Sequence, residues 1–463
     1  MKKNNGIIGI ILAGGEGTRM KSGVPKVLHN LAGKPLLLYP INAVIKNNCV
    51  KNIVVVGRDK DQVIEAFKEY DLVFTEQVKR LGSGDALKTA IKKIPKTFRG
   101  DIVILCGDTP LLTGGSLRKL ISEHKKKKNK ITILTAKIDN PFGYGRISRN
   151  KENKVTAIIE EKDASSIERN ISEVNSGVYC CDYNAIKQAL PLIKNNNKKN
   201  EYYLTDVVKI LASKGARIGA FTLSNSIEIR GVNTRMDLAK AQKHIMENIT
   251  NKLMSDGVTI LYPEQVYIED TVKIGRDTII LPGCMLKGKL KIGKACVIGP
   301  NTVIEDCALG DGVEIRSSYV YGSKIGDNVK IGPFSHVRPG TVIGNGARIG
   351  NFSEIKKSQI GSLTKVSHLS YIGDTKLGRD VNIGAGTITC NYDGKDKHES
   401  EVGDGSFIGS NTNLIAPIKI GKNVIIAAGS TINQDVPDNS LSIARSRQTN
   451  KLGWVASKKR RKK

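Results

Sequence analysis

An aliphatic residue recurs at every sixth position in two blocks of the C-terminal half of this chain. The first block consists of Ile325, Ile331, Val337, Ile343, Ile349 and Ile355. The second consists of Val402, Ile408, Leu414, Ile420, Ile426 and Ile432. A helix needs apolar residues about 3.6 positions apart and a half-buried strand alternates every two, so this spacing fits neither. It fits a solenoid, in which each step is a short strand plus a corner and the aliphatic side chain fills the interior.

The repeat runs from about Val266 to Ile432, and a glycine often follows its aliphatic position, as at Gly326, Gly344 and Gly350. It resembles the left-handed parallel β-helix of hexapeptide acyltransferases. The left hand is implied by this resemblance alone, because ordinary parallel crossovers are right-handed. A rod that has no chemistry and serves only assembly is the alternative interpretation.

Lys and Arg outnumber Asp and Glu by 73 to 44, which gives the 463-residue chain a net charge of +29. This excess is compatible with nucleic acid, an acidic membrane or anionic small molecules as partners. No basic segment is interleaved with aromatic residues and no apolar run reaches membrane-spanning length, so we expect neither nucleic acid nor a membrane as partner. The basic run over residues 458–463 is expected to be a solvated tail.

Eight cysteines are spread along the sequence without a C-x-x-C pair, which indicates neither a zinc site nor a redox motif. We therefore expect a reduced, cytoplasmic protein. The apolar run over residues 7–12 follows Lys2 and Lys3, as in a signal peptide, but it is short and leads directly into a glycine-rich segment.

The N-terminal half alternates apolar runs with helical patterns, which predicts an α/β domain with a Rossmann-like, mostly parallel sheet. We expect strands over residues 7–12, 53–56 and 102–105, and helices over 85–93, 116–127 and 237–253. The expected division of the chain is an N-terminal domain over residues 1–231, a linker helix over 232–254, and a β-helix domain with a C-terminal tail over 255–463.

A glycine-rich segment follows the first expected strand and has the sequence Leu12-Ala13-Gly14-Gly15-Glu16-Gly17-Thr18-Arg19-Met20. Glycines at the C-terminal end of a strand let backbone N–H groups close on phosphates. The segment lacks the G-K-[ST] of a P-loop and the third glycine of a dinucleotide fingerprint. Arg19 and Lys26 add positive charge within reach of a polyphosphate. A tight glycine turn with exposed charges is the alternative.

Together with Val24-Pro25-Lys26-Val27-Leu28, this segment is similar to the L-x-x-G-x-G-T-R-M…P-K signature of sugar-phosphate nucleotidyltransferases. Those enzymes join a sugar 1-phosphate to a nucleoside triphosphate and release pyrophosphate. The resemblance implies that the nucleotide contacts Leu12, Ala13, Gly14 and Gly15. It also implies that Arg19 and Lys26 hold phosphates, because such cations, with Mg²⁺, stabilise the charge on a phosphoryl group in transfer.

A second segment extends the resemblance to the base. Gln77 with Gly82 and Ser83 resembles the uracil-binding stretch of the bacterial uridylyltransferases in this family. That stretch usually has Gly-Thr-Gly-His, whereas this chain has Gly-Ser-Gly-Asp, which ends at Asp85. Ser83 keeps a hydroxyl, but Asp85 departs from the family pattern.

Gly107 and Asp108 follow the strand expected over residues 102–105, at the edge where open α/β sheets bind ligands. Asp108 is the expected Mg²⁺ ligand, since Mg²⁺ prefers oxygen donors. A turn or capping role is the alternative. By resemblance, Asn233 is the partner of Asp108 at the metal. The same resemblance implies that the amino sugar is held by Gly145, Glu160 and Asn175.

His368 lies inside the repeat, and Arg338, Lys356 and Lys357 lie in neighbouring repeats, which stacking places side by side. A base beside a cationic phosphate pocket suits acyl transfer to an amino sugar phosphate, because the attacking amine must lose a proton and histidine titrates in the useful range. A structural or merely exposed histidine is the alternative. Residues 391–401 interrupt the six-residue spacing, as a functional insertion would.

Residues 334–340, 350–357 and 382–394 match the acetyltransferase half of the bacterial uridylyltransferase/glucosamine-1-phosphate acetyltransferase family, and the resemblance spans nearly the whole chain. It implies that His368 is the general base and that Glu354 orients it. It implies that the acceptor is held by Arg338, Lys356, Tyr371, Asn382, Asn391 and Tyr392. It implies an acetyl-CoA groove lined by Ala385, Ser410, Ala428 and Arg445. The family assembles as homotrimers, with acetyl-transfer sites between subunits.

The sequence therefore predicts one enzyme with two active sites, for cell-wall precursor synthesis. The rod is expected to acetylate glucosamine 1-phosphate with acetyl-CoA. The α/β domain is expected to couple the resulting N-acetylglucosamine 1-phosphate to UTP with Mg²⁺, giving UDP-N-acetylglucosamine and pyrophosphate. Two alternatives are a nucleotidyltransferase with a purely structural rod and a basic protein that binds nucleic acid.

Overall fold

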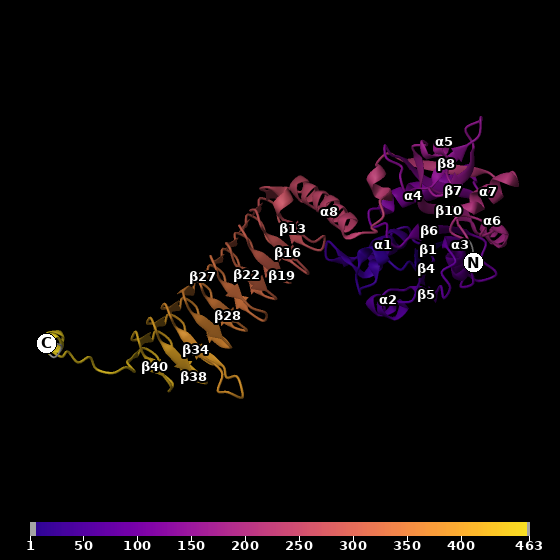
Figure 1. Cartoon of the computed structure of the whole chain (residues 1–463). Coiled ribbons are helices and arrows are strands. Elements are labelled where there is room, and N and C mark those ends of the chain that lie inside the picture. The colour runs from indigo at the N-terminus through magenta and orange to yellow at the C-terminus, as the bar shows by residue number, and fades with distance from the viewer. Residues whose placement is uncertain (1–5, 461–463) are drawn as a thin grey trace. The chain divides into compact units, whose positions relative to one another are not determined.

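The computed structural model describes residues 6–460 of the chain (Figure 1). Lys2, Lys3 and the last three residues of the basic run over 458–463 lie outside this described part. The chain forms two compact units, Met1–Ile245 and Met246–Lys463, and helix α8 (Arg235–Ser255) contains the boundary between them. The functional limits expected at residues 231 and 254 stay a prediction. In the described part, no helix is long and apolar enough to cross a membrane.

One mixed, mostly parallel sheet forms the centre of the N-terminal unit. Its strands are, in spatial order, β11 (Ile218–Leu223), β7 (Ile131–Lys137), β10 (Glu173–Asp182), β6 (Asp101–Cys106), β1 (Ile7–Ala13), β4 (Lys51–Val56) and β5 (Val73–Glu76). Only β10 runs antiparallel to its neighbours along this path. Two smaller strands extend this sheet: β8 (Arg146–Arg149) pairs with β10, and β9 (Val155–Ile159) pairs with β8. A separate hairpin consists of β2 (Asn30–Leu31) and β3 (Lys34–Pro35). The predicted sheet type is thus confirmed.

Helices cover both faces of this sheet. Side chains alternate along a strand, so Ile8 and Ile10 of β1 belong to one apolar cluster and Ile7 and Ile11 to the other. The first cluster includes residues of α3 (Ser83–Ile91), α6 (Tyr183–Ala189) and α7 (Asp206–Ser213). The second includes residues of α1 (Leu38–Ile45), α2 (Lys60–Ala66) and α4 (Gly114–Lys127). The short helix α5 (Ser166–Arg169) contacts β8.

The second unit is a parallel β-helix whose coils supply strands to three sheets (Figure 1). The first rod sheet contains β12 (Thr259–Ile260), β15 (Ile279–Ile280), β18 (Val297–Ile298), β21 (Glu314–Ile315), β24 (Lys330–Ile331), β27 (Arg348–Asn351), β30 (Lys365–His368), β33 (Asn382–Ile383), β36 (Phe407–Ile408), β39 (Ile425–Ile426) and β41 (Leu441–Ser442). The second contains β13 (Tyr267–Ile268), β16 (Met285–Lys287), β19 (Val303–Glu305), β22 (Tyr319–Tyr321), β25 (His336–Val337), β28 (Glu354–Lys356), β31 (Tyr371–Gly373), β34 (Ile388–Cys390), β37 (Asn413–Ile415) and β40 (Thr431–Ile432). The third contains β14 (Lys273–Ile274), β17 (Lys291–Ile292), β20 (Ala308–Leu309), β23 (Lys324–Ile325), β26 (Val342–Ile343), β29 (Gln359–Ile360), β32 (Thr375–Leu377), β35 (Ser400–Val402) and β38 (Ile418–Ile420).

The aliphatic residues at every sixth position fill the interior of the rod. Every member of both blocks exposes at most 4 % of its surface, which confirms the predicted repeat. Coils stack closely, and a Cβ at Gly350 would lie 2.0 Å from the carbonyl oxygen of Ser367 in the next coil, so only glycine fits there. The stack is longer than expected, from Thr259 to Ser442, because its outer coils lack the regular spacing. Helix α9 (Trp454–Arg460) follows it.

Candidate active sites

Four polar side chains from distant parts of the sequence meet at the carboxyl ends of β1 and β6. The Nζ of Lys26 forms an ion pair with the carboxylate of Asp108, which follows β6. The same Nζ donates to Oδ1 of Asn233 at 3.2 Å, and Nη2 of Arg19 donates to that oxygen at 2.9 Å. The structure therefore brings together the two cations and the two oxygen donors that the sequence assigned to phosphate and Mg²⁺.

We call Arg19, Lys26, Asp108 and Asn233 the phosphate cluster, after its expected ligand. Backbone contacts hold this cluster in place. The N–H of Val232 donates to the carbonyl of Asp108 at 2.8 Å, which ties the two segments to each other. The N–H groups of Asn233 and Thr234 donate to Oδ2 of Asp237 at 3.1 and 2.9 Å, at the start of α8. Asn233 is thus fixed by a helix N-terminus whose capping partner, Asp237, was not expected.

Asp108 and Asn233 supply the oxygen donors that Mg²⁺ prefers. Among the residues that the structure describes, no group of three or more His, Cys, Asp or Glu side chains could hold a metal ion. A site with one carboxylate and one amide oxygen suits Mg²⁺, because this ion is commonly bound by few protein ligands together with substrate phosphates.

The three residues expected to hold the sugar lie beside the phosphate cluster. The N–H of Asn175 donates to the carbonyl of Gly145 at 2.8 Å. Burial raises the pKa of Glu160, whose Oε1 accepts from the Thr205 hydroxyl at 3.0 Å. The charges of Asp108, Lys26 and Glu160 all act on the Cys106 thiol at the end of β6. The phosphate cluster and the residues expected to hold the sugar therefore lie around the same strand end.

Burial and the neighbouring Asp108 raise the pKa of Cys106 to about 12. Its thiol therefore stays neutral at physiological pH and is no nucleophile.

Gln77 follows β5 and is buried, with 7 % of its surface exposed. Its Nε2 donates to the carbonyl of Gly82 at 3.0 Å and to Oδ2 of Asp85 at 2.9 Å. Its Oε1 faces the glycine-rich loop, since a Cβ at Gly14 would lie 3.3 Å from this oxygen. Ser83 points elsewhere, because its hydroxyl accepts from the N–H of Leu204 at 3.0 Å.

The glycine-rich loop leaves β1 at the same edge. Leu12 and Ala13 end the strand, and Gly14 and Gly15 follow it. The N–H of Gly107 donates to the carbonyl of Leu12 at 2.9 Å, which aligns the ends of β1 and β6. The residues expected to contact nucleotide thus lie along one edge of the sheet.

His368 ends β30 at the corner between the first and second rod sheets, and its side chain is exposed. Asn351 is its register partner in the preceding coil. A groove of about 400 Å³ opens beside it and is lined by Arg316, Lys330 and Arg348, among others. His368 is therefore accessible to a ligand and lies in positive surroundings.

Ala385, Ser410, Ala428 and Arg445 lie at the same corner in successive coils. The carbonyl of Ala385 accepts from the N–H of Asn411 at 2.7 Å, and the carbonyl of Ser410 accepts from the N–H of Gly429 at 2.7 Å. Each donor directly follows the next member of this column. Nη1 of Arg445 donates to the carbonyl of Ala428 at 2.9 Å. The residues expected to line the acetyl-CoA groove therefore form a continuous column that begins one coil after His368.

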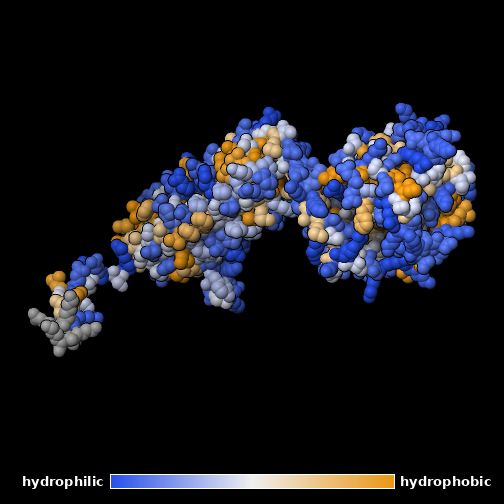
Figure 2. Space-filling model, turned by 45° about the horizontal axis from the view of Figure 1, so that its top comes forward, coloured by the Kyte–Doolittle hydropathy of each residue, from blue (hydrophilic) through white to orange (hydrophobic). Residues whose placement is uncertain are grey.

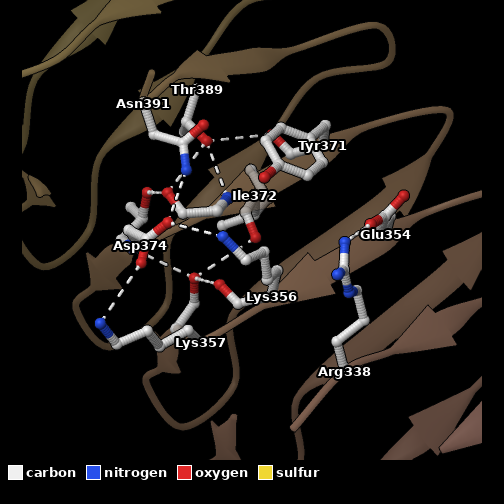
Figure 3. A network of polar contacts seen from close by, with 12 residues as sticks. Arg338, Glu354, Lys356, Lys357, Tyr371, Ile372, Asp374, Thr389 and Asn391 are labelled. Atoms are coloured by element: carbon white, nitrogen blue, oxygen red, sulfur yellow. Dashed lines mark hydrogen bonds and ion pairs between the residues drawn. The ribbon is translucent and has the colours of Figure 1, made fainter. Parts of the chain in front are cut away.

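A cationic cluster occupies the next corner, between the second and third rod sheets (Figure 3). Its centre is the Asp374 carboxylate, whose side chain is 5 % exposed. Lys356 Nζ lies 3.2 Å from one oxygen and Lys357 Nζ 3.8 Å from the other. Nδ2 of Asn391 donates to Asp374 at 2.5 Å. Asp374 was not predicted, because nothing in the spacing marks a buried carboxylate.

Lys397 adds a further cation to this cluster from the inserted loop. A hydrogen bond that the neutral amine of Lys397 accepts raises the pKa of Lys356, and the Asp374 carboxylate acts in the same direction. Contact with Lys356 lowers the pKa of Lys397, and Arg338 acts in the same direction. Positive charges that approach one another in this way favour an anion between them. The interruption of the repeat was the sequence signal that could have identified Lys397.

Glu354 faces Arg338, and Oε1 accepts from Nη1 at 2.8 Å. No contact between Glu354 and His368 occurs among the described residues, so an orienting role for Glu354 stays a prediction. Tyr371 is the register partner of Glu354 on the second sheet. Asn382 lies apart from them on the first sheet, next to Lys365. Tyr392 lies in the inserted loop, where its hydroxyl donates to the Gly394 carbonyl at 2.6 Å.

Within one chain, the residues expected at the acetyl-transfer site are therefore distributed over two corners and two sheets of the rod. His368 and the column of Ala385 belong to one corner of the rod, whereas Lys356 and Asn391 belong to the next corner.

Comparisons with known proteins agree with this architecture. Residues 9–174 match the MobA-like NTP transferase domain, and residues 322–357 and 399–434 match the bacterial transferase hexapeptide (six repeats). The fold and the sites thus define a transferase with a nucleotidyltransferase domain followed by a hexapeptide acyltransferase domain.

Relatives of nearly full length refine this class. The bifunctional protein GlmU of Thermoanaerobacter pseudethanolicus is 49 % identical over 97 % of this chain and 98 % of its own length. The bifunctional protein GlmU of Carboxydothermus hydrogenoformans is 47 % identical, over 96 % and 99 %. That of Clostridioides difficile is 46 % identical, over 97 % of both chains. This chain belongs to the GlmU family of bifunctional proteins.

Proposed function

We propose that the rod acetylates glucosamine 1-phosphate with acetyl-CoA, and that the N-terminal unit then transfers UMP from UTP to N-acetylglucosamine 1-phosphate. The products are UDP-N-acetylglucosamine, a precursor of the cell wall, and pyrophosphate. The observation that carries the proposal is the presence, in one chain, of a phosphate cluster around Asp108 and a separate cationic cluster around Lys356.

In uridylyl transfer, Lys26 and Arg19 bind the phosphates of UTP. Asp108 and Asn233 would hold Mg²⁺, which would supply positive charge to neutralise the charge that develops on the phosphates. Gly145, Glu160 and Asn175 hold the sugar so that its phosphate oxygen attacks the α-phosphorus. One P–O bond forms as another breaks, and pyrophosphate leaves. Gln77 contacts the base, while Leu12 to Gly15, Gly82, Ser83 and Gly107 shape the nucleotide site.

In acetyl transfer, His368 accepts a proton from the amine of the sugar as the nitrogen attacks the thioester carbonyl. The C–N bond forms, the C–S bond breaks, and the thiolate of coenzyme A leaves and takes up a proton. Arg338, Lys356 and Lys397 bind the phosphate of the acceptor, and Tyr371, Asn382, Asn391 and Tyr392 contact its sugar. Acetyl-CoA lies along Ala385, Ser410, Ala428 and Arg445.

A homotrimer completes the acetyl-transfer site in this proposal. The separation of His368 and Lys356 on two corners supports it, because a neighbouring rod can supply the missing corner. Exposed apolar residues on the rod also support it (Figure 2), and they include Tyr319, Phe334, Phe352, Leu369, Phe407 and Ile425. The eight free thiols support a reducing, cytoplasmic setting.

The proposal is tested by product analysis with glucosamine 1-phosphate, acetyl-CoA, UTP and Mg²⁺. The complete mixture should give UDP-N-acetylglucosamine. Without acetyl-CoA, neither N-acetylglucosamine 1-phosphate nor UDP-N-acetylglucosamine should form. Without UTP or Mg²⁺, the reaction should stop at N-acetylglucosamine 1-phosphate. A protein that converts added N-acetylglucosamine 1-phosphate to the UDP-sugar but does not acetylate glucosamine 1-phosphate would contradict the proposed role of the rod.

A further inference from the structure

Asp85 is the residue of the nucleotide site that the proposed function leaves without a role. It lies in the first turn of α3, partly exposed, and its carboxylate oxygen accepts from Nε2 of Gln77 at 2.9 Å. The second acceptor for the same nitrogen is the carbonyl of Gly82, at 3.0 Å. Gln77 is buried at the edge of the sheet where β1, β4 and β5 end.

These two contacts fix which end of the Gln77 amide faces the ligand. A carbonyl oxygen and a carboxylate can only accept hydrogen bonds, so both require the NH₂ end of the amide. The amide has two N–H bonds, and each has one of these partners. The structure therefore leaves no amide proton of Gln77 for a base. A half-turn of the amide would bring its oxygen against two acceptor oxygens, which is unfavourable.

The other end of the amide faces the nucleotide loop. Oε1 of Gln77 approaches Gly14, where an added Cβ would lie 3.3 Å away, and no described residue donates to this oxygen. Gln77 thus presents one fixed acceptor toward the place where the base of the nucleotide is proposed to bind.

We propose that Asp85 is a positioning residue that selects the base by locking Gln77 as an acceptor. Uracil has an N–H at ring position 3, which Oε1 can accept, whereas cytosine has a lone pair there, which would face the oxygen without a proton between them. A site that leaves a buried polar atom unpaired in this way discriminates strongly against the wrong ligand. The inference rests on the proposed function, since it takes the nucleoside triphosphate to bind against Gln77.

Asp85 suits this task better than a residue that both donates and accepts. An imidazole, as in the family pattern, can present either a donor or an acceptor, whereas a carboxylate presents only acceptors. Asp85 therefore leaves a single orientation for the Gln77 amide.

The test compares Asp85→Leu, which removes the acceptor at similar size, with the matched variant Asp85→Asn, whose side-chain oxygen can still accept. For each protein, kcat/KM is measured with UTP and with CTP, and the two dissociation constants are measured by calorimetry. Asp85→Leu should lower the ratio of kcat/KM for UTP to kcat/KM for CTP on the order of tenfold. Both a higher value for CTP and a lower value for UTP should contribute. Asp85→Asn should keep most of the parental preference.

Cooperative thermal unfolding of the N-terminal unit, compared with that of the parental protein by calorimetry, shows that the variants are folded, and Asp85→Ala replaces Asp85→Leu if the latter does not fold. An unchanged UTP/CTP ratio in Asp85→Leu would overturn the inference, as would an equal loss in Asp85→Asn. The calorimetric ratio decides this even for a protein that forms no UDP-sugar. A parental protein that binds UTP but makes no UDP-N-acetylglucosamine would instead contradict the proposed function.

Discussion

Lys356 and Asp374 lie one coil apart on the rod, with 3.2 Å between Nζ and the nearer carboxylate oxygen, and Asp374 is nearly inaccessible to solvent. The pair holds a cation in place beside the cluster that is proposed to bind the acceptor phosphate. Asp374→Asn keeps the shape but leaves Lys356 without its counter-charge. We expect the free energy of unfolding of the rod to fall by about 1–3 kcal/mol, measured by denaturant titration.

Glu354→Gln is the matched control for this substitution. Its partner Arg338 lies on the neighbouring coil, and both side chains are about 40 % exposed (39 % and 42 %). Exposed ion pairs contribute little, so the change should be within about 0.5 kcal/mol. A loss as large in Glu354→Gln as in Asp374→Asn would show that burial of Asp374 is not what matters.

Lys397 should act on the acceptor and not on the acetyl donor. Lys397→Ala is expected to raise KM for glucosamine 1-phosphate on the order of tenfold, because a charge-assisted contact to phosphate is lost. KM for acetyl-CoA should stay near the parental value. Lys395→Ala, two positions earlier in the same loop, should change neither constant. Equal effects of the two substitutions would contradict the assignment.

The pH dependence of acceptor binding should report the same residue. Contact with Lys356 lowers the pKa of Lys397, so Lys397 loses its charge at a lower pH than an ordinary lysine. KM for glucosamine 1-phosphate should therefore begin to rise earlier in the alkaline range in the parental protein. This early rise should be missing in Lys397→Ala, whose KM is already high.

Glu160 should make the N-terminal unit less stable as pH rises. Burial raises the pKa of Glu160 above its ordinary value of 4.5, so the folded state binds its proton more tightly than the unfolded state. That contribution is complete below 4.5 and is lost as pH rises through the folded pKa. Glu160→Gln removes the titration, so its stability relative to the parental protein should increase as pH rises above 4.5, measured by calorimetric unfolding.

Glu161 offers the opposite case at the next position. A hydrogen bond from Arg146, first among its partners, lowers the pKa of Glu161. Its contribution is present above 4.5 and is lost as pH falls through the folded pKa. Glu161→Gln should therefore become less stable relative to the parental protein as pH rises. The same trend in both variants would refute the pKa directions.

The repeat shows what the sequence could predict. Because stacking requires one interior residue per step, the spacing of Ile331 and Ile349 identified the rod and its buried positions. The convergence of Lys26, Asp108 and Asn233 followed from the family signature, since the carboxyl ends of strands meet at one edge.

Other features leave no periodic trace. Asp374 follows a strand end like many surface residues, and only the three-dimensional structure shows that it is buried between two lysines. The position of Lys397 depends on the conformation of an inserted loop, which no repeat determines. The antiparallel direction of β10 likewise depends on chain connections and not on its apolar run.

The central claim, two independent active sites in one chain, is tested most directly by measuring both activities of Asp108→Ala and His368→Ala. Asp108→Ala should abolish uridylyl transfer and acetylate at the parental rate. His368→Ala should acetylate 10²- to 10⁴-fold more slowly, as an order of magnitude for a lost general base, and should use N-acetylglucosamine 1-phosphate and UTP at the parental rate. Folded variants that lose both activities together, or a His368→Ala protein that acetylates at the parental rate, would contradict the account.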